Sequence, residues 1–284
     1  MPIRFAHRGA SAIAPENTMP AFEAALGMKV DGLELDVHCS KDGQLVVIHD
    51  FDLVRVGTIA TSSKSTPSNE KEKPTSKSTT SRRSKTAKEP EKESTNEPAK
   101  LGKISEYTAE ELAQIDVGSW FDKKFKGVGV PTLVQVLDLV QNHSVGSDLA
   151  INVEIKSMDP LGGNQVEPLV ELIQERGLYE QVIVSCMNPV TLIKTRWEDS
   201  EVRLGLLHRG TLPIYLQKAW MSSIIEPEAL HPHHTVVDEA YMAFAKKHGC
   251  EVNTWTVNDA AEAKRLADLG VTAIISDAPD KLGL

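Results

Sequence analysis

The chain has 284 residues, enough for one large domain or two small ones. Its 40% hydrophobic and 25% charged residues are typical of a globular protein, and its net charge of −9 argues against general nucleic-acid binding, which needs a broad basic surface. No apolar run is long enough to cross a membrane, and the N-terminus lacks a signal-peptide pattern. The three cysteines lie far apart in the sequence, so they predict a reducing compartment, the cytoplasm, rather than a disulfide scaffold.

Residues 61–97 differ in composition from the rest of the chain. They contain no Val, Ile, Leu, Met, Phe, Trp or Tyr, and 16 of these 37 residues are Ser or Thr. Such a segment cannot bury enough apolar surface to offset the entropy lost on ordering it. We therefore predict a disordered insertion at about 58–100 that interrupts a single domain spanning residues 1–284. A phosphorylated or anion-binding segment around Arg82 and Arg83 is the alternative interpretation.

Outside this segment, short apolar runs rich in β-branched residues alternate with longer amphipathic stretches. The short runs predict eight strands: Ile3–Gly9, Gly32–Cys39, Leu149–Ile155, Gln181–Met187, Arg203–His208, Ser223–Ala229, Glu251–Val257 and Ala273–Ser276. The amphipathic stretches predict helices: Thr18–Met28, Thr132–His143, Val166–Arg176, Pro189–Trp197, Leu212–Trp220, Val236–His248 and Asn258–Leu269.

Cap residues mark the ends of several predicted helices. Thr18 and Asn258 stand where an N-cap is expected. Gly249 and Gly270 follow the last two helices, and glycine commonly ends a helix because it accepts a left-handed backbone.

Eight strands separated mainly by helices predict an α/β fold, a (β/α)₈ TIM barrel. About 245 residues remain without the insertion, close to the usual size of this barrel. The turn Lys41–Gly43 adds one irregular feature, because Asp-Gly between two strand-like runs predicts a hairpin in which Gln44–Asp50 returns beside the second strand. A doubly wound open sheet is the alternative.

A barrel places its chemistry at the carboxyl ends of the strands. Glu34 and Asp36 are two residues apart on the second strand, so both point to one face, and Glu154 lies near the end of the third. Buried acidic residues are rare unless they are paired or bind a metal. Three converging carboxylates predict a site for Mg²⁺, Ca²⁺ or Mn²⁺, since hard cations prefer oxygen ligands.

Basic and imidazole side chains occupy the same predicted strand ends. Arg8 and Lys156 would make the pocket positive and suited to a phosphate. His7 and His49 flank it and could divide the roles of general acid and general base near neutral pH. Together these residues predict metal-assisted cleavage of a phosphate ester.

Two further histidine groups leave alternatives open. His208 and Arg209 end the fifth predicted strand and could contact substrate. The run of residues 231–234, His-Pro-His-His, looks like a metal cluster, but its proline favours a solvated turn or the entry to a helix.

Several segments taken together resemble the glycerophosphodiester phosphodiesterase family, which we identify by a set of separate motifs. These are His7-Arg8-Gly9, Pro15-Glu16-Asn17-Thr18, Glu34-Leu35-Asp36-Val37, His49-Asp50, Asn152-Val153-Glu154-Ile155-Lys156, Asn253-Thr254-Trp255-Thr256-Val257-Asn258 and Ser276-Asp277-Ala278-Pro279. The resemblance covers residues 3–57 and about 101–284.

The resemblance implies a TIM barrel that uses a divalent metal to hydrolyse a small-molecule glycerophosphodiester to sn-glycerol 3-phosphate and an alcohol. By position it implies roles that we list by type: His7 and His49 as the catalytic pair, Glu34, Asp36 and Glu154 as metal ligands, Arg8 and Lys156 as phosphate contacts, and Trp255 as an aromatic of the substrate cleft. A core position for Trp255 is the alternative.

Three other functions remain open at this point. A lysophospholipase D acting on lysophospholipids would need an apolar track near the barrel mouth, which Trp220, Met221 and residues 214–216 could supply. A phospholipase C-like enzyme fits the first-loop and second-strand motifs less well. A catalytically silent phosphate-binding protein would not need both histidines. The sequence does not indicate the alcohol, the metal or the oligomeric state.

Overall fold

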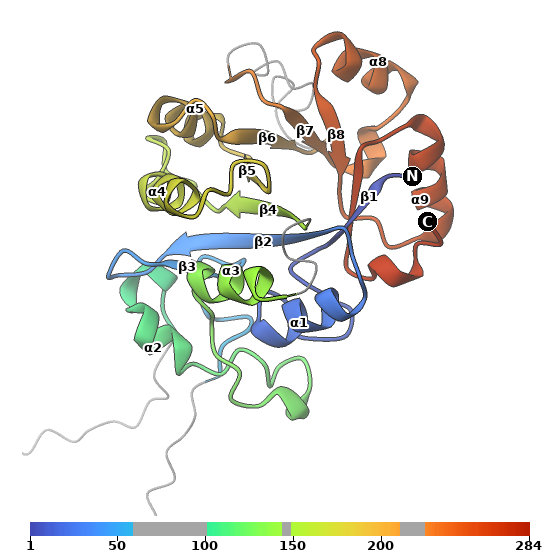
Figure 1. Ribbon diagram of the computed structural model, residues 1–284. Helices are drawn as coiled ribbons and strands as arrows, with labels where there is room; N and C mark the ends of the chain where they lie inside the picture. The colour runs from blue at the N-terminus through green and yellow to red at the C-terminus, as the bar shows by residue number, and fades with distance from the viewer. Residues whose placement is uncertain (59–100, 144–148, 211–224) are drawn as a thin grey trace, which may run out of the picture.

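A closed barrel of parallel strands forms the centre of the molecule (Figure 1). The computed structural model describes residues 1–58, 101–143, 149–210 and 225–284. Its barrel strands, in spatial order, are β1 (Ile3–Ala6), β9 (Ala273–Ser276), β8 (Glu251–Thr254), β7 (Ala229–Pro232), β6 (Arg203–His208), β5 (Val182–Cys186), β4 (Ala150–Ile155) and β2 (Gly32–Cys39). β1 also pairs with β2, which closes the ring and confirms the predicted TIM barrel.

Helices cover the outside of this ring and connect its strands (Figure 1). The longer helices among the described residues are α1 (Met19–Gly27), α3 (Leu133–Gln141), α4 (Val166–Arg176), α5 (Pro189–Glu198), α8 (Glu239–Lys247) and α9 (Ala260–Leu269). The shorter ones are α2 (Ala109–Ala113) and the 3₁₀ turns η1 (Ile104–Glu106), η2 (Lys123–Phe125), η4 (His234–Val236) and η5 (Pro279–Lys281). Within the described ranges, no helix is both long and apolar enough to span a membrane.

The hairpin predicted after the second strand is present. β3 (Leu45–Val47) runs antiparallel to the end of β2, with Val37 opposite Val47. His49 therefore comes two residues after the end of β3 and lies at the mouth of the barrel rather than on a barrel strand. The predicted insertion at about 58–100 begins nine residues further on and falls almost entirely outside the described residues.

Backbone hydrogen bonds join the chain before that segment to the chain after it. We call the two bonded pairs, Leu53 with Gly102 and Thr58 with Asp116, the insertion base. Leu53 N donates to Gly102 O at 3.1 Å, and Thr58 N donates to Asp116 O at 2.7 Å. The described residues that flank the segment are thus held together beside β3.

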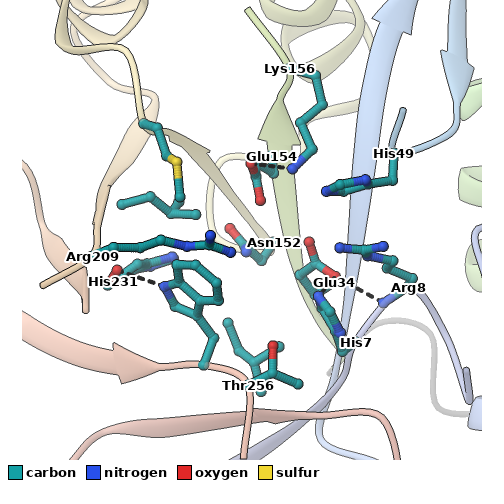
Figure 2. A pocket seen from close by; sticks show the side chains of 14 residues that line it. His7, Arg8, Glu34, His49, Asn152, Glu154, Lys156, Arg209, His231 and Thr256 are labelled. Atoms are coloured by element: carbon teal, nitrogen blue, oxygen red, sulfur yellow. Dashed lines mark hydrogen bonds and ion pairs between the residues drawn. The ribbon is translucent and has the colours of Figure 1, made fainter. Parts of the chain in front are cut away.

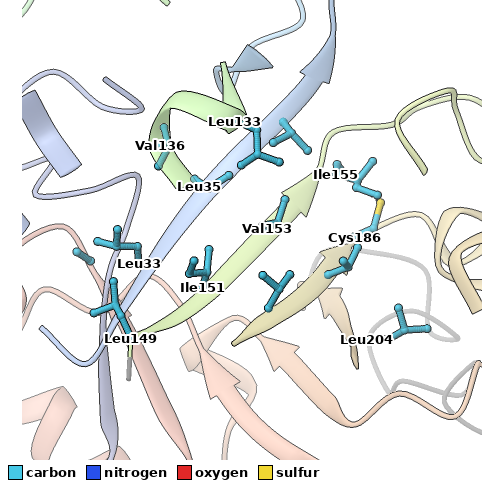
Figure 3. Close-up of a cluster of buried hydrophobic side chains, with 14 of the residues drawn as sticks. Leu33, Leu35, Leu133, Val136, Leu149, Ile151, Val153, Ile155, Cys186 and Leu204 are labelled. Carbon is cyan, nitrogen blue, oxygen red and sulfur yellow. The ribbon is translucent and has the colours of Figure 1, made fainter. Parts of the chain in front are cut away.

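Alternation along β2 separates the core from the site. Leu33 and Leu35 point outward and pack with Leu133 and Val136 of α3 and with apolar residues of β4 (Figure 3). The residues between them, at positions 34 and 36, point to the inner face instead. Helix packing therefore fixes the face on which the two acidic side chains lie.

The strand predicted at Ser223–Ala229 is wrong in position. The structure begins β7 at Ala229, and Glu226 has a positive φ of 50° that no regular strand tolerates. Pro227 also lacks the N–H that a central strand must donate. The apolar run misled the prediction because Ile225 is buried without belonging to the sheet.

The ends of three predicted helices also differ from the structure. Asp259, not Asn258, caps α9 by accepting a hydrogen bond from Glu262 N at 2.9 Å. Thr18 holds the N-cap position of α1, but its hydroxyl donates to Pro15 O instead of capping. The helix predicted at 236–248 begins only at residue 239, after the turn η4, and the helix predicted at 212–220 lies outside the described residues.

Candidate active site

A cavity of about 310 Å³ opens at the carboxyl ends of the barrel strands (Figure 2). One part of its wall is polar and charged, and the other carries Trp255 and aliphatic side chains. The lining residues are His7, Arg8, Glu34, His49, Asn152, Glu154, Lys156, Met187, Leu207, Arg209, His231, Trp255, Thr256 and Ile275.

Three buried carboxylates converge on the polar side. Glu34 and Asp36 come from β2 and Glu154 from β4, where Asp36 is the direct neighbour of Glu154 in the parallel register. One oxygen from each lies within 4.8 Å of the others. Within the described part of the chain, this is the only such grouping of acidic, histidine or cysteine side chains. Burial, together with repulsion from Asp36 and Glu154, raises the pKa of Glu34 to about 8.

This cluster fits a divalent cation by its chemistry. All three donors are hard carboxylate oxygens, and a bound cation would offset the repulsion that raises the pKa of Glu34. The side-chain oxygen of Asn152, two residues before Glu154 on β4, is buried and accepts no hydrogen bond from any described residue. It lines the same cavity and adds a fourth oxygen near the cluster.

Two basic side chains lie against the acidic cluster. Lys156 Nζ is 2.9 Å from Asp36 Oδ1 and 2.5 Å from Glu154 Oε1. Arg8 Nε is 3.2 Å from Asp36 Oδ2. Although burial alone would raise the pKa of Asp36, these two cations hold it far below its usual range. Asp36 is therefore ionised at neutral pH. The site thus combines buried carboxylates with the cationic side chains of Arg8 and Lys156 beside them.

The turn after β1 places Arg8 in the cavity. Arg8 and Gly9 both have positive φ, 56° and 78°, and a Cβ on Gly9 would lie 2.6 Å from the backbone carbon of Ala21 in α1. Only glycine permits this approach. The Arg8 N–H then donates to Glu34 Oε2 at 2.8 Å, which fixes both groups.

His7 is held by a carboxylate from the far end of the chain. Its Nδ1 lies 2.6 Å from Asp277 Oδ1, just after β9, while Nε2 is 3.9 Å from Glu34 Oε2. Asp277 is itself fixed by Ser11 Oγ at 2.9 Å and Asn258 Nδ2 at 2.6 Å. Burial would lower the pKa of His7, but Glu34 and Asp277 outweigh it and raise that pKa.

His49 has the same kind of partner. Its Nδ1 lies 2.7 Å from Asp50 Oδ1, and burial lowers its pKa despite the nearby Asp36. In both histidines a carboxylate binds Nδ1, so an Nδ1–H tautomer leaves Nε2 as the nitrogen available to substrate.

Arg55 connects the two sides of the polar wall. It donates from Nε to Asp50 Oδ2 at 2.5 Å and from a guanidinium nitrogen to Glu16 Oε1 at 2.6 Å. Glu16 Oε1 also accepts from Arg8 at 2.8 Å. One guanidinium thereby restrains the partner of His49 and the partner of Arg8 together.

Trp255 forms part of the opposite wall. Its side chain is 9% exposed, its Nε1 donates to His231 O at 2.8 Å, and the Arg209 guanidinium lies 4.9 Å from its ring centre. It belongs to the same buried cluster as Leu207 and Ile275, which also line the cavity. The residue is thus both a cleft wall and a packed core side chain, so the two sequence interpretations do not exclude each other.

The sequence profile of the glycerophosphoryl diester phosphodiesterase family matches residues 7–281. A glycerophosphodiester phosphodiesterase from Caldanaerobacter subterraneus subsp. tengcongensis is 31% identical over 277 residues, covering 98% of this chain and 94% of that protein. The chain belongs to this family. A glycerophosphodiester phosphodiesterase from Bacillus subtilis is 26% identical over 290 residues, with coverage of 97% and 83%. The resemblance inferred from the motifs is confirmed.

Solved structures agree with the fold of this phosphodiesterase family member. A phosphodiesterase from Oleispira antarctica, in complex with the product sn-glycerol-3-phosphate, superposes with a TM-score of 0.75 at 22% identity, covering 100% of this chain and 96% of that one. A glycerophosphodiester phosphodiesterase from Agrobacterium tumefaciens gives 0.71 at 22% identity, covering 99% of each chain. Both comparisons support the barrel architecture.

The structure brings all eight residues predicted for the site to one place. Seven of them line the cavity, and Asp36 lies behind it against Arg8 and Lys156. Arg209 also lines the cavity, as the open alternative allowed, whereas His208 is buried and contacts Tyr241 Oη at 2.7 Å.

The interpretation of residues 231–234 as a solvated turn is wrong for its first histidine. His231 belongs to β7, is 1% exposed and contacts Asn253 Nδ2 at 3.1 Å. Gly205 on the neighbouring strand makes room, because a Cβ there would lie 2.6 Å from the imidazole. His234 is the histidine of the turn and pairs with Glu262 at 2.7 Å.

Sequence reasoning missed three polar residues of the site. Asp277 and Asn152 stand within the quoted motifs without an assigned role, and Arg55 lies outside those motifs. Asn152 could have been found by spacing, because it lies two residues before Glu154 on the same strand and must share its face. The other two offer no such signal, since their contacts depend on the closure of the barrel.

Proposed function

We propose that this family member hydrolyses glycerophosphodiesters to sn-glycerol 3-phosphate and an alcohol. The observation that carries the proposal is the convergence, in one cavity, of three carboxylates, two cations and two carboxylate-bound histidines. Relatives named glycerophosphodiester phosphodiesterase, and a structural neighbour bound to sn-glycerol-3-phosphate, support the substrate class.

The basic residues bind the phosphate in this proposal. Arg8 offers a planar guanidinium and Lys156 an ammonium, both already at the cavity wall. Charge-assisted bonds from these groups would hold the phosphate oxygens and stabilise the charge that develops on them. Trp255 gives the glycerol moiety an apolar wall.

The acidic cluster holds the metal in this proposal. Glu34, Asp36 and Glu154 would bind one divalent cation, Mg²⁺, Ca²⁺ or Mn²⁺, which when bound supplies Lewis-acid stabilisation of the phosphate charge. The carboxylate donor set supports this class of ion over Zn²⁺.

His7 and His49 transfer the protons. One histidine takes a proton from water as the water oxygen bonds to phosphorus, and the other gives a proton to the departing alcohol oxygen as its bond to phosphorus breaks. Asp277 and Asp50 orient the two rings by binding Nδ1. Which ring is the base stays open, and a route through the substrate's own glycerol hydroxyl and a cyclic phosphate is the alternative.

Release of sn-glycerol 3-phosphate from glycerophosphocholine tests the proposal. Purified protein is assayed with EDTA and with Mg²⁺, Ca²⁺ or Mn²⁺ in parallel. Metal-dependent release is expected, with near-complete loss in His7→Ala and His49→Ala and loss of metal dependence in Glu34→Gln. No release from this substrate or from lysophospholipids with any metal would refute the proposal and favour a phosphate-binding protein. The residues predicted to form a lipid track, 214–216 and 220–221, lie outside the described residues.

A further inference from the structure

A second hollow adjoins the catalytic cavity. It has a volume of about 410 Å³ and lies between η1 and the loop that joins β4 to α4. Among the described residues, Lys156 is the one residue that lines both hollows. We call this second hollow the side groove, and its walls include Phe51, Met158, Lys103, Gly163 and Gln165.

The side groove contains a buried hydrogen-bond acceptor that nothing described satisfies. Gln165 is 7% exposed, and its Nε2 donates to the Lys156 carbonyl at 2.9 Å. That bond fixes the amide so that Oε1 is the free end, and Oε1 accepts no hydrogen bond from any described residue. An unsatisfied buried acceptor is destabilising, so a ligand that donates a hydrogen bond there would relieve that penalty.

Gly163 packs directly against this acceptor. Gly163 has a φ of 78°, and a Cβ on it would lie 2.3 Å from Gln165 Oε1 and 2.7 Å from Ser157 Oγ. Glycine therefore meets a backbone requirement, and any larger residue at 163 would press on both the amide oxygen and the hydroxyl.

We propose that the side groove binds the alcohol half of the diester and favours alcohols that carry hydroxyl or ammonium donors. This proposal rests on the proposed function, because it places the phosphate beside Lys156. A diester bound there has two arms on opposite sides of that lysine. One arm lies in the cavity against Trp255, and the other enters the side groove.

The remaining walls suit a small polar alcohol rather than a bare anion. Phe51 and Met158 are 45% and 80% exposed and offer apolar contact to a carbon chain. Asp159 and the Gln165 oxygen supply acceptors, while Lys103 stands on the opposite side at η1. The groove therefore accepts donors near Gln165 and carbon near Phe51.

The first test compares alcohols on one phosphate. The ratio of kcat/KM for glycerophosphoethanolamine to that for glycerophosphocholine, whose head group has no N–H, is measured in wild type and in Gln165→Met. We expect the wild-type ratio to exceed one and to fall about fivefold in Gln165→Met. An unchanged ratio would overturn the proposal.

A second pair of variants does not depend on the buried amide. Met158 and Leu161 share one loop and are almost equally exposed, 80% and 81%, but only Met158 lines the groove. Met158→Trp should lower the ratio of kcat/KM for glycerophosphoinositol to that for the methyl diester of glycerol 3-phosphate about tenfold. Leu161→Trp should leave that ratio unchanged. Equal ratios in both variants would overturn the side-groove assignment.

The two proposals fail in different ways. If wild type releases glycerol 3-phosphate from none of these diesters, the proposed function and the groove assignment both fall. If wild type is active and both ratios are insensitive to the groove variants, the function stands and the groove assignment alone is refuted.

Discussion

The contact between His7 and Asp277 gives the sharpest prediction for catalysis. In Asp277→Asn the side chain keeps its size and one oxygen near His7 Nδ1, but it loses the charge that makes the 2.6 Å bond strong. Charge-assisted hydrogen bonds contribute about 1.5–3 kcal/mol, which corresponds to about 10- to 150-fold in rate. Since the Asp277 side chain is 34% exposed, solvent screening favours the lower part of that range. We expect kcat to fall about 10- to 30-fold, with KM little changed.

Metal-supplemented release of glycerol 3-phosphate provides the assay, and thermal unfolding checks that the variant folds. Asp280→Asn is the matched control, because Asp280 is an exposed acid in the same segment and contacts none of the described residues of the site. Asp277→Ala, which also removes the oxygen, should be slower than Asp277→Asn. Wild-type kcat in Asp277→Asn would refute the view that this carboxylate orients the catalytic ring. So would an equal loss in Asp280→Asn.

Three further predictions concern the frame around the site. Arg55→Lys should lower kcat/KM about fivefold, because a lysine cannot bridge two carboxylates in a fork, and full activity would show that the bridge is dispensable. Leu33→Ala should lower the free energy of unfolding by about 2–5 kcal/mol in urea titrations, since Leu33 is fully buried, and a loss under 1 kcal/mol would contradict that packing. Hydrogen bonds from Arg265 hold the pKa of Glu262 at about 2, below its ordinary 4.5. The stability that Glu262 adds is therefore present above pH 4.5 and lost toward pH 2, so the difference in unfolding free energy between wild type and Glu262→Gln should shrink over that range.

The parts of the site that the sequence predicted share one property. Glu34, Asp36 and Glu154 sit on strands, where a period of two fixes the face of each side chain, and barrel topology then places the strand ends together. His7 and Arg8 follow from the barrel rule alone, because they come directly after the first strand. Local pattern plus one fold rule is enough for these residues.

Two of the three residues that sequence reasoning missed, Asp277 and Arg55, depend on contacts between distant parts of the chain. Asp277 reaches His7 across 270 positions, and Arg55 reaches Glu16 across 39. No periodicity encodes such pairs, since each forms only when β1 and β9 become neighbours or when the hairpin returns over the barrel mouth. The prediction of a turn at His231 was wrong for a different reason. Pro232 ends a strand here, whereas proline usually marks a turn.

The insertion base makes the geometry of the site independent of the number of residues between positions 58 and 101. Because Leu53 is bonded to Gly102, and Thr58 to Asp116, we expect a change in the length of the chain between residues 58 and 101 to leave the position of His49 unchanged. Closing a flexible loop costs only about 0.6 kcal/mol more for each doubling of its length. This position is therefore suited to insertions. A longer segment, a tag or a whole domain could be inserted here, close to the candidate active site, without changing the arrangement of its residues.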